Sequence, residues 1–153
     1  MKKKMLVQSA LALTIGTCLL LPFLRAADAD LTVSIPPIVQ AGLAVFASGG
    51  AEPAVLAWRK GGPLEGEKDA TVQTENFKQM ERSLGHYRSY ELIETKEIAK
   101  SSKIIYLVMN FERGAAFASF LVYRTRKDWI VQDMDFDTKP EAIMPWLAVH
   151  EAK

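Results

Sequence analysis

The spacing of apolar residues predicts helices in the first part of the folded chain and strands in the second. After a short alternating lead-in over residues 30–36, apolar side chains recur every three or four positions, which is the period of a helix with one buried face. A first-turn proline and paired glycines mark the ends of such segments. Helices are therefore predicted to begin at Ile38, Pro53 and Asp69, and to end at Gly49-Gly50, Gly61-Gly62 and Gly85.

Beyond Gly85 the apolar period changes to two, and branched and aromatic residues become frequent, as in strands. The links between the apolar segments are short, so consecutive strands must run antiparallel. A capping box formed by Thr138 and Glu141 predicts a short last helix from Lys139 to Pro145. The predicted strands cover residues 87–98, 103–112, 115–125 and 128–137.

This order of elements predicts an α+β fold in which three N-terminal helices pack on a curved four-stranded antiparallel meander sheet, followed by a short C-terminal helix. The layout, with the stretches GHYRSYE at residues 85–91 and DWIVQDMDF at 128–136, resembles the nuclear-transport-factor-two-like cone-fold superfamily and its small exported members. The resemblance implies a single cone-like domain over residues 37–147, with a polar tail at 148–153. That superfamily includes isomerases, dehydratases and binding modules, so it implies a pocket and no particular chemistry.

The first 29 residues have the pattern of a secretory signal peptide: three lysines at positions 2–4, an apolar segment from Met5 to Leu24, and small residues around the cleavage site. Cleavage after Ala29 is predicted, with Ala26 as the second choice. The domain is then exported to the periplasm or the extracellular space. The alternatives are an uncleaved membrane anchor, since about 20 apolar residues can span a bilayer, and a lipoprotein acylated at Cys18.

Composition narrows the function of the exported part. Removal of residues 1–29 leaves 124 residues with 15 basic and 17 acidic side chains and no cysteine. A net charge near −2 gives no reason to expect nucleic-acid binding, and disulfides and thiolate metal sites are ruled out. We expect no metal, no cofactor, and no membrane contact beyond the export signal.

The two faces of the predicted sheet differ in composition. If Arg113-Gly114 forms a two-residue turn, Asn110 pairs with Phe117 and Tyr106 pairs with Leu121. One face is then wholly apolar, and we expect the helices to cover it. The other face, here called the mixed face, is predicted to carry the ligand-contacting residues Tyr106, Asn110, Phe117 and Tyr123. Its partner is a small apolar ligand or a second copy of the chain; alternatively, the tail containing Trp146 and Leu147 covers it.

Two groups are candidates for general-base catalysis. Asp133, Asp135 and Asp137 are spaced by two on the last strand, so they point to one face, which they share with Val131. On the cone folds that the chain resembles, a buried Asp serves as the base of an isomerase. His86 is the second candidate. The competing interpretations are a solvated strand face for the aspartates and a loop-edge residue for His86.

The sequence therefore favours an exported, non-catalytic ligand-binding or protein-interaction module. The alternative is a cone-fold isomerase or dehydratase that uses an Asp of the last strand or His86 as its base.

Overall fold

The computed structural model describes residues 35–66 and 70–150. The predicted signal peptide and its cleavage site lie outside these residues, as does most of the lead-in. The helices are α1 (Pro37–Gly49), α2 (Ala51–Arg59), α3 (Ala70–Leu84) and the short α4 (Pro140–Ile143), followed by a 3-10 helix, η1 (Pro145–His150). The strands are β1 (Tyr87–Ala99), β2 (Ser102–Phe111), β3 (Ala115–Arg124) and β4 (Trp129–Asp137).

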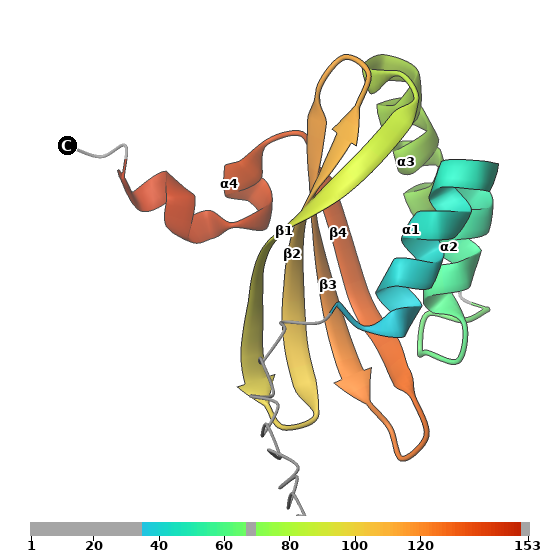
Figure 1. Ribbon diagram of the computed structural model, residues 1–153, viewed down its shortest axis with the longest axis vertical. Helices are drawn as coiled ribbons and strands as arrows, with labels where there is room; N and C mark the ends of the chain where they lie inside the picture. The colour runs from blue at the N-terminus through green and yellow to red at the C-terminus, as the bar shows by residue number, and fades with distance from the viewer. Residues whose placement is uncertain (1–34, 67–69, 151–153) are drawn as a thin grey trace, which may run out of the picture. The chain divides into compact units, whose positions relative to one another are not determined.

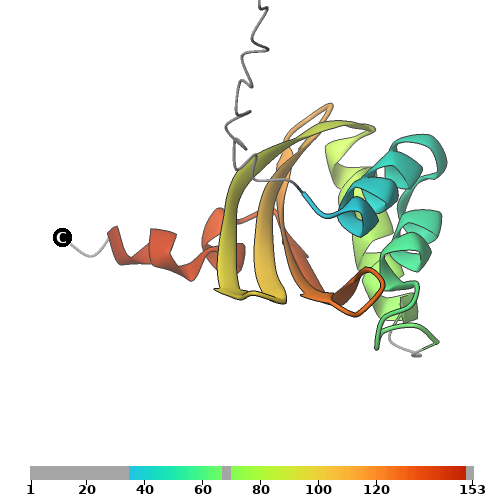
Figure 2. The same cartoon turned by 60° about the horizontal axis from the view of Figure 1, so that its bottom comes forward.

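The four strands form one antiparallel sheet in the order β1-β2-β3-β4, so each strand pairs with its neighbour in sequence. This confirms the α+β class, the four-stranded antiparallel sheet with its helices, and a short C-terminal helix. Figure 1 shows the helices α1, α2 and α3 along one side of the sheet. Figure 2 shows that α4 lies on the opposite side of the sheet, and that the chain then extends away from the sheet in η1.

The core lies between the sheet and α1–α3. Trp58 of α2 is fully buried at its centre, where its ring lies 5.1 Å from that of Phe120 and 5.9 Å from that of Phe77. The indole N–H donates a hydrogen bond to the Val39 carbonyl at 3.0 Å, so its polar group is satisfied without water. The middle of the sheet face below these rings, on β2 and β3, is apolar, as predicted. Its fully buried side chains include Ile105, Leu107, Met109, Phe120 and Val122.

The predicted register of the central hairpin is wrong by two residues. The Phe111 amide donates to the Gly114 carbonyl at 2.9 Å, so the turn is formed by Glu112 and Arg113 and not by Arg113-Gly114. Asn110 therefore pairs with Ala115, and Tyr106 pairs with Ser119. Because the shift is an even number, the side chains of β2 and β3 keep the faces that the sequence predicted for them.

The alternation of β4 is interrupted where the pairing with β3 changes register. Asp133 pairs with Leu121 and Val131 pairs with Val122, so Gln132 is an extra residue in β4. Such a bulge moves the residues before it to the other face. Val131 is consequently fully buried in the core, and its predicted place beside the aspartates is wrong.

The C-terminal segment also differs from its prediction. Lys139 precedes α4 without any side-chain capping bond, so the capping box of Thr138 and Glu141 does not form. A different side-chain bond forms just before α4, because Asp137 Oδ1 accepts from the Lys139 amide at 2.8 Å. After α4 the chain turns again into η1, which ends at His150. Among the described residues, no helix has the length and apolarity needed to cross a membrane.

Candidate functional site

The predicted ligand-contacting residues all lie on the mixed face, but they do not surround one cavity. Tyr106 is buried, Asn110 and Phe117 are half-buried, and Tyr123 is 38% exposed. The Asn110 amide is occupied, because its Nδ2 donates to Glu91 Oε1 at 2.8 Å and to Ser89 Oγ at 3.3 Å. The mixed face is therefore a surface with several separate local environments.

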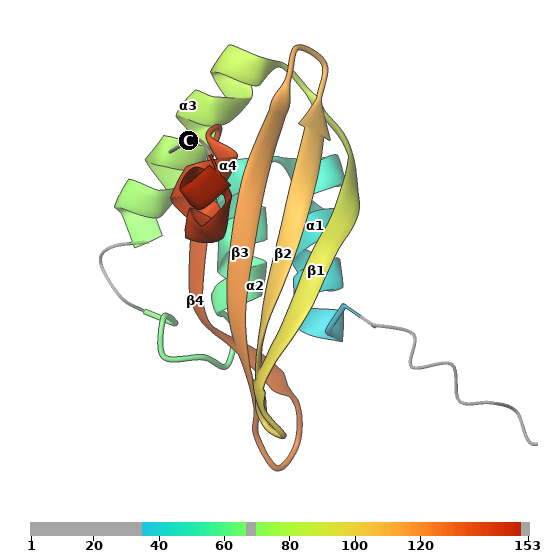
Figure 3. The same cartoon turned by 90° about the vertical axis from the view of Figure 1, so that its left-hand side faces the viewer.

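The C-terminal segment covers the middle of the mixed face. Tyr106 packs against Ile143 of α4 and against Met144, which follows it, and its ring lies 4.9 Å from that of Trp146 at nearly a right angle. Burial, with a contribution from the charge of Glu94, raises the pKa of the Tyr106 phenol. This arrangement matches the alternative in which the tail with Trp146 covers the face. Figure 3 shows α4 lying over the strands on this side.

The aspartates of β4 lie on the mixed face, beside the residues of β3 with which they pair. Asp133 and Asp135 are exposed, and Asp137 is half-buried. Asp135 also borders a pocket of about 130 Å³ between β4 and α3, beside Phe77 and Phe136. Desolvation, with a contribution from the charge of Asp133, raises the pKa of the Asp135 carboxyl. A pocket of this size is below the roughly 300 Å³ typical of ligand sites, so it offers no substrate-sized space beside this carboxylate.

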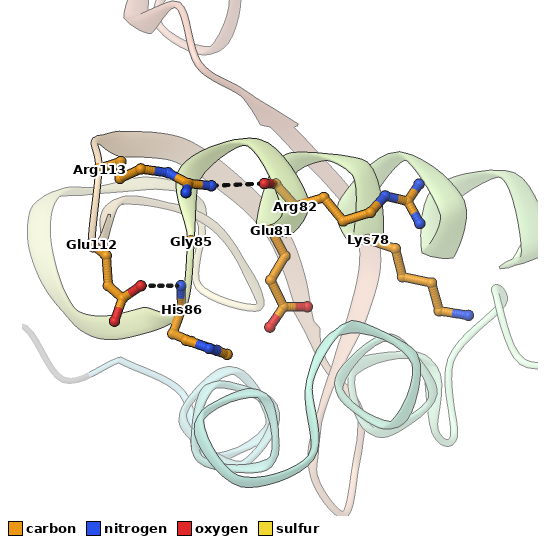
Figure 4. Close-up of a pocket in the computed structure, with 7 residues that line it drawn as sticks. All are labelled: Lys78, Glu81, Arg82, Gly85, His86, Glu112 and Arg113. Atoms are coloured by element: carbon orange, nitrogen blue, oxygen red, sulfur yellow. Dashed lines mark hydrogen bonds between the residues drawn. The ribbon is translucent and has the colours of Figure 1, made fainter.

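His86 borders an open pocket of about 460 Å³ beside the β2–β3 turn (Figure 4). The pocket lies where the last turn of α3 meets the β2–β3 turn. Six charged or ionisable side chains and a glycine line it. They are Lys78, Glu81, Arg82, Gly85, His86, Glu112 and Arg113. His86 itself is exposed.

The contacts in this pocket fasten the β2–β3 turn to α3. The Arg113 guanidinium donates to the carbonyls of Arg82 at 2.8 Å and Ser83 at 3.0 Å, which otherwise have no partner at the helix end. Glu112 accepts from the His86 amide at 3.3 Å and from Arg88 at 2.9 Å. The His86 amide, together with the positive charges of Arg88, His86 and Arg113, lowers the pKa of the Glu112 carboxyl. These carboxylate and guanidinium groups serve structure, and no serine, threonine or cysteine lies among the lining residues.

A shallower groove of about 640 Å³ separates α1 from the start of β1. Its walls include Ala41, Ala44 and Ala47 from α1 and Tyr87 and Tyr90 from β1. Sequence reasoning did not identify this groove, because it depends on how α1 crosses the sheet. Tyr106, Asn110, Phe117 and Tyr123 line neither this groove nor the other pockets described above. Within residues 35–66 and 70–150, no three His, Cys, Asp or Glu side chains gather in a way that could hold a metal ion.

The fold and the mixed face define a small α+β domain with a partly covered aromatic and polar sheet surface. No family model matches the chain, and no curated protein matches it. Among solved structures, it is similar to a DUF4783 family protein from Bacteroides uniformis, with 7% sequence identity and a TM-score of 0.45. The similarity covers 66% of this chain and 97% of that protein. At this level it supports no inference about family or function.

Proposed function

We propose that the chain is an exported, non-catalytic interaction module that binds a second copy of itself through the mixed face of its sheet. The observation that carries this proposal is the partial cover of that face. α4 and η1 bury Tyr106, but Tyr123 of β3 and Leu147 of η1 remain 38% and 40% exposed. Large apolar side chains that stay open beside polar ones are typical of contact surfaces.

The form of the surface favours a protein partner over a small ligand. The four predicted ligand-contacting residues do not line one pocket. The buried Tyr106 already packs against Ile143, Met144 and Trp146 of the same chain. A small apolar ligand needs an enclosed pocket that removes most of its surface from water. A second protein surface instead covers scattered apolar side chains over a broad, shallow area.

The proposal includes the cone-like form of the domain and its export. The sequence of α1, α2 and α3 before a four-stranded meander supports the cone-like layout that the resemblance to the nuclear-transport-factor-two-like superfamily implies. The lysines at positions 2–4 and the apolar segment that follows support export. Neither catalytic candidate adds to this proposal, because Asp133, Asp135 and His86 are exposed and the pocket beside Asp135 is small.

The test is the oligomeric state of the purified protein and its Leu147→Glu variant. The negative charge introduced at position 147 is expected to weaken self-association by at least about tenfold, because an unpaired carboxylate would be buried in the contact. Native mass spectrometry and light scattering measure the change, and the same spectra reveal any small ligand that stays bound. Leu56→Glu is the matched control, since Leu56 is 60% exposed on α2, across the sheet.

A monomeric wild-type protein that carries no ligand and binds no copy of itself would contradict self-association. Equal effects of Leu147→Glu and Leu56→Glu would contradict the location on the mixed face. A bound small apolar molecule that Leu147→Glu releases would replace the protein partner by the ligand alternative.

A further inference from the structure

Two turns that are far apart in sequence form one end of the sheet. The β1–β2 turn and the β3–β4 turn lie at the same end and extend past α1 and α2 (Figures 1 and 3). The Arg124 amide donates to the Ser101 carbonyl at 2.7 Å, which joins the two turns directly. We call residues 97–103 and 123–129 the basic tip.

The β3–β4 turn is held in one conformation by Thr125. Its Oγ1 accepts from the amides of Lys127 at 3.2 Å and Asp128 at 3.0 Å, and its own amide donates to the Asp128 carbonyl at 2.9 Å. Such side-chain bonds fix a short turn. Arg126 and Lys127 at its apex are exposed, so the turn presents both cations to the outside.

The charges of the domain are divided between the tip and the remainder. The basic tip has five basic and two acidic side chains, a net charge of +3, whereas the other described residues have eight basic and eleven acidic ones, a net charge of −3. The side chains of Lys100, Arg126 and Lys127 form no ion pair with any residue in the described part of the chain. The positive field of the tip is therefore not neutralised locally.

Apolar side chains accompany these cations. Ile98 is 58% exposed, because the register of β1 and β2 shifts between Glu97 and Ala99 and leaves it outside the ladder. Tyr123 is also exposed. Trp129 lies beneath Lys103 and Arg124, whose charged groups are 4.8 and 5.9 Å from its ring. A projecting end thus combines lysine and arginine with aliphatic and aromatic groups.

We propose that the basic tip docks the domain onto a bilayer surface that contains anionic phospholipid headgroups. Lysine and arginine bind the headgroup phosphates, while Ile98 and Tyr123 enter the boundary between headgroups and acyl chains. This site shares Tyr123 with the mixed face, whereas Leu147 and the covered Tyr106 of the proposed protein contact lie outside the tip.

The composition and form of the tip favour a membrane over a nucleic acid. Nucleic-acid binding requires many phosphate contacts along a groove or a stripe, and the tip has a small convex end with a net charge of only +3. An exposed isoleucine gains nothing from a phosphate backbone. The same side chain gains free energy when it enters the interfacial region of a bilayer.

The first test compares two triple variants. Each is expressed from the full-length gene, and the purified protein is used. Lys100→Gln, Arg126→Gln and Lys127→Gln together are expected to weaken binding to vesicles of phosphatidylcholine with roughly one-third phosphatidylglycerol by about a hundredfold. Vesicle co-sedimentation measures the affinity. The control combines Lys60→Gln, Arg82→Gln and Lys139→Gln, three exposed cations elsewhere. It changes the net charge equally and is expected to retain binding.

The second test addresses the apolar contribution. Ile98→Ser is expected to weaken vesicle binding several-fold, whereas Val72→Ser is expected to leave it unchanged. The two side chains are matched, since Val72 on α3 is 59% exposed and Ile98 is 58% exposed. Thermal melting of each variant checks that the fold is retained. The binding is also expected to decrease as salt rises, because screening acts on the cations.

Four results would overturn the proposal. The first is equal binding of the wild-type protein to vesicles of phosphatidylcholine alone, and the second is an equal loss in the two triple variants. The third is the absence of vesicle binding. The fourth is an oligonucleotide complex that the tip variant loses while vesicle binding stays unchanged, which would identify a nucleic acid as the partner. None of these results depends on the mixed face, because Leu147 is unchanged in all of these variants.

Discussion

The two faces of the sheet are covered in different ways. Three helices bury the middle of the apolar face, with Trp58 at the centre and with Ile105, Leu107 and Val122 inaccessible to solvent. On the mixed face, α4 and η1 cover Tyr106 but leave Leu147 and Tyr123 partly open. One face therefore stabilises the fold, whereas the other retains free surface that a partner can cover. Both faces result from the alternation of side chains along β2 and β3.

The largest expected effect comes from a pair of tryptophan substitutions. Trp58→Ala is expected to lower the free energy of unfolding by about 3–5 kcal/mol, because it leaves a cavity among several rings and removes the hydrogen bond to the Val39 carbonyl. Trp146→Ala on the partly covered face is expected to cost about 1 kcal/mol, since that ring is already partly in water. Urea denaturation measures both. Equal losses would contradict the difference between the faces.

A smaller effect is expected at the helix that covers the apolar face. Gly42 of α1 lies against Trp58, and a methyl group there would overlap the indole ring. Gly42→Ala is therefore expected to destabilise the protein by about 1–3 kcal/mol, although alanine is ordinarily the better helix former by about 1 kcal/mol. In the Trp58→Ala background the cost is expected to disappear. A higher midpoint of Gly42→Ala in urea would show that the packing around the indole can relax.

The smallest effect concerns alkaline pH. Tyr87 lies half-buried between Phe46 and Phe111, and desolvation, with a contribution from Tyr90, raises its pKa from 10.0 to about 12. Because the fold favours the neutral phenol, this stabilisation is present below pH 10.0 and is lost as the pH rises through about 12. The loss is about 1 kcal/mol once solvent screening of this partly exposed group is included.

Tyr87→Phe has no phenol to ionise, so its stability is expected to fall less than that of the wild type across this alkaline interval. Urea midpoints measured at several pH values provide the comparison. Parallel curves for the two proteins would contradict the assignment to Tyr87.

The sequence predicted the elements better than the details of their pairing. The change of apolar period near Gly85 located the strands, because alternation along a half-buried sheet is a strong signal. The predicted register of the β2–β3 hairpin was wrong by two residues, because the local sequence does not show that Glu112, and not Gly114, belongs to the turn. Gln132 gave no sign of the bulge that moves Val131 into the core.

The candidate sites were less predictable for a physical reason. The mixed face was found because it repeats every second residue along neighbouring strands. The pocket beside His86 joins residues 78–86 to Glu112 and Arg113, and the basic tip joins two turns separated by more than twenty positions. Such sites exist only once the strands are paired, so a scan for local motifs does not reveal them.

The meander order of the sheet bears on how the molecule assembles. Every strand hydrogen-bonds to the strand next to it in the chain, and the links between strands contain only a few residues. The loops that must close are short, and their entropic cost is small. Sheet formation can therefore advance one hairpin at a time from either end, which favours rapid folding of the sheet.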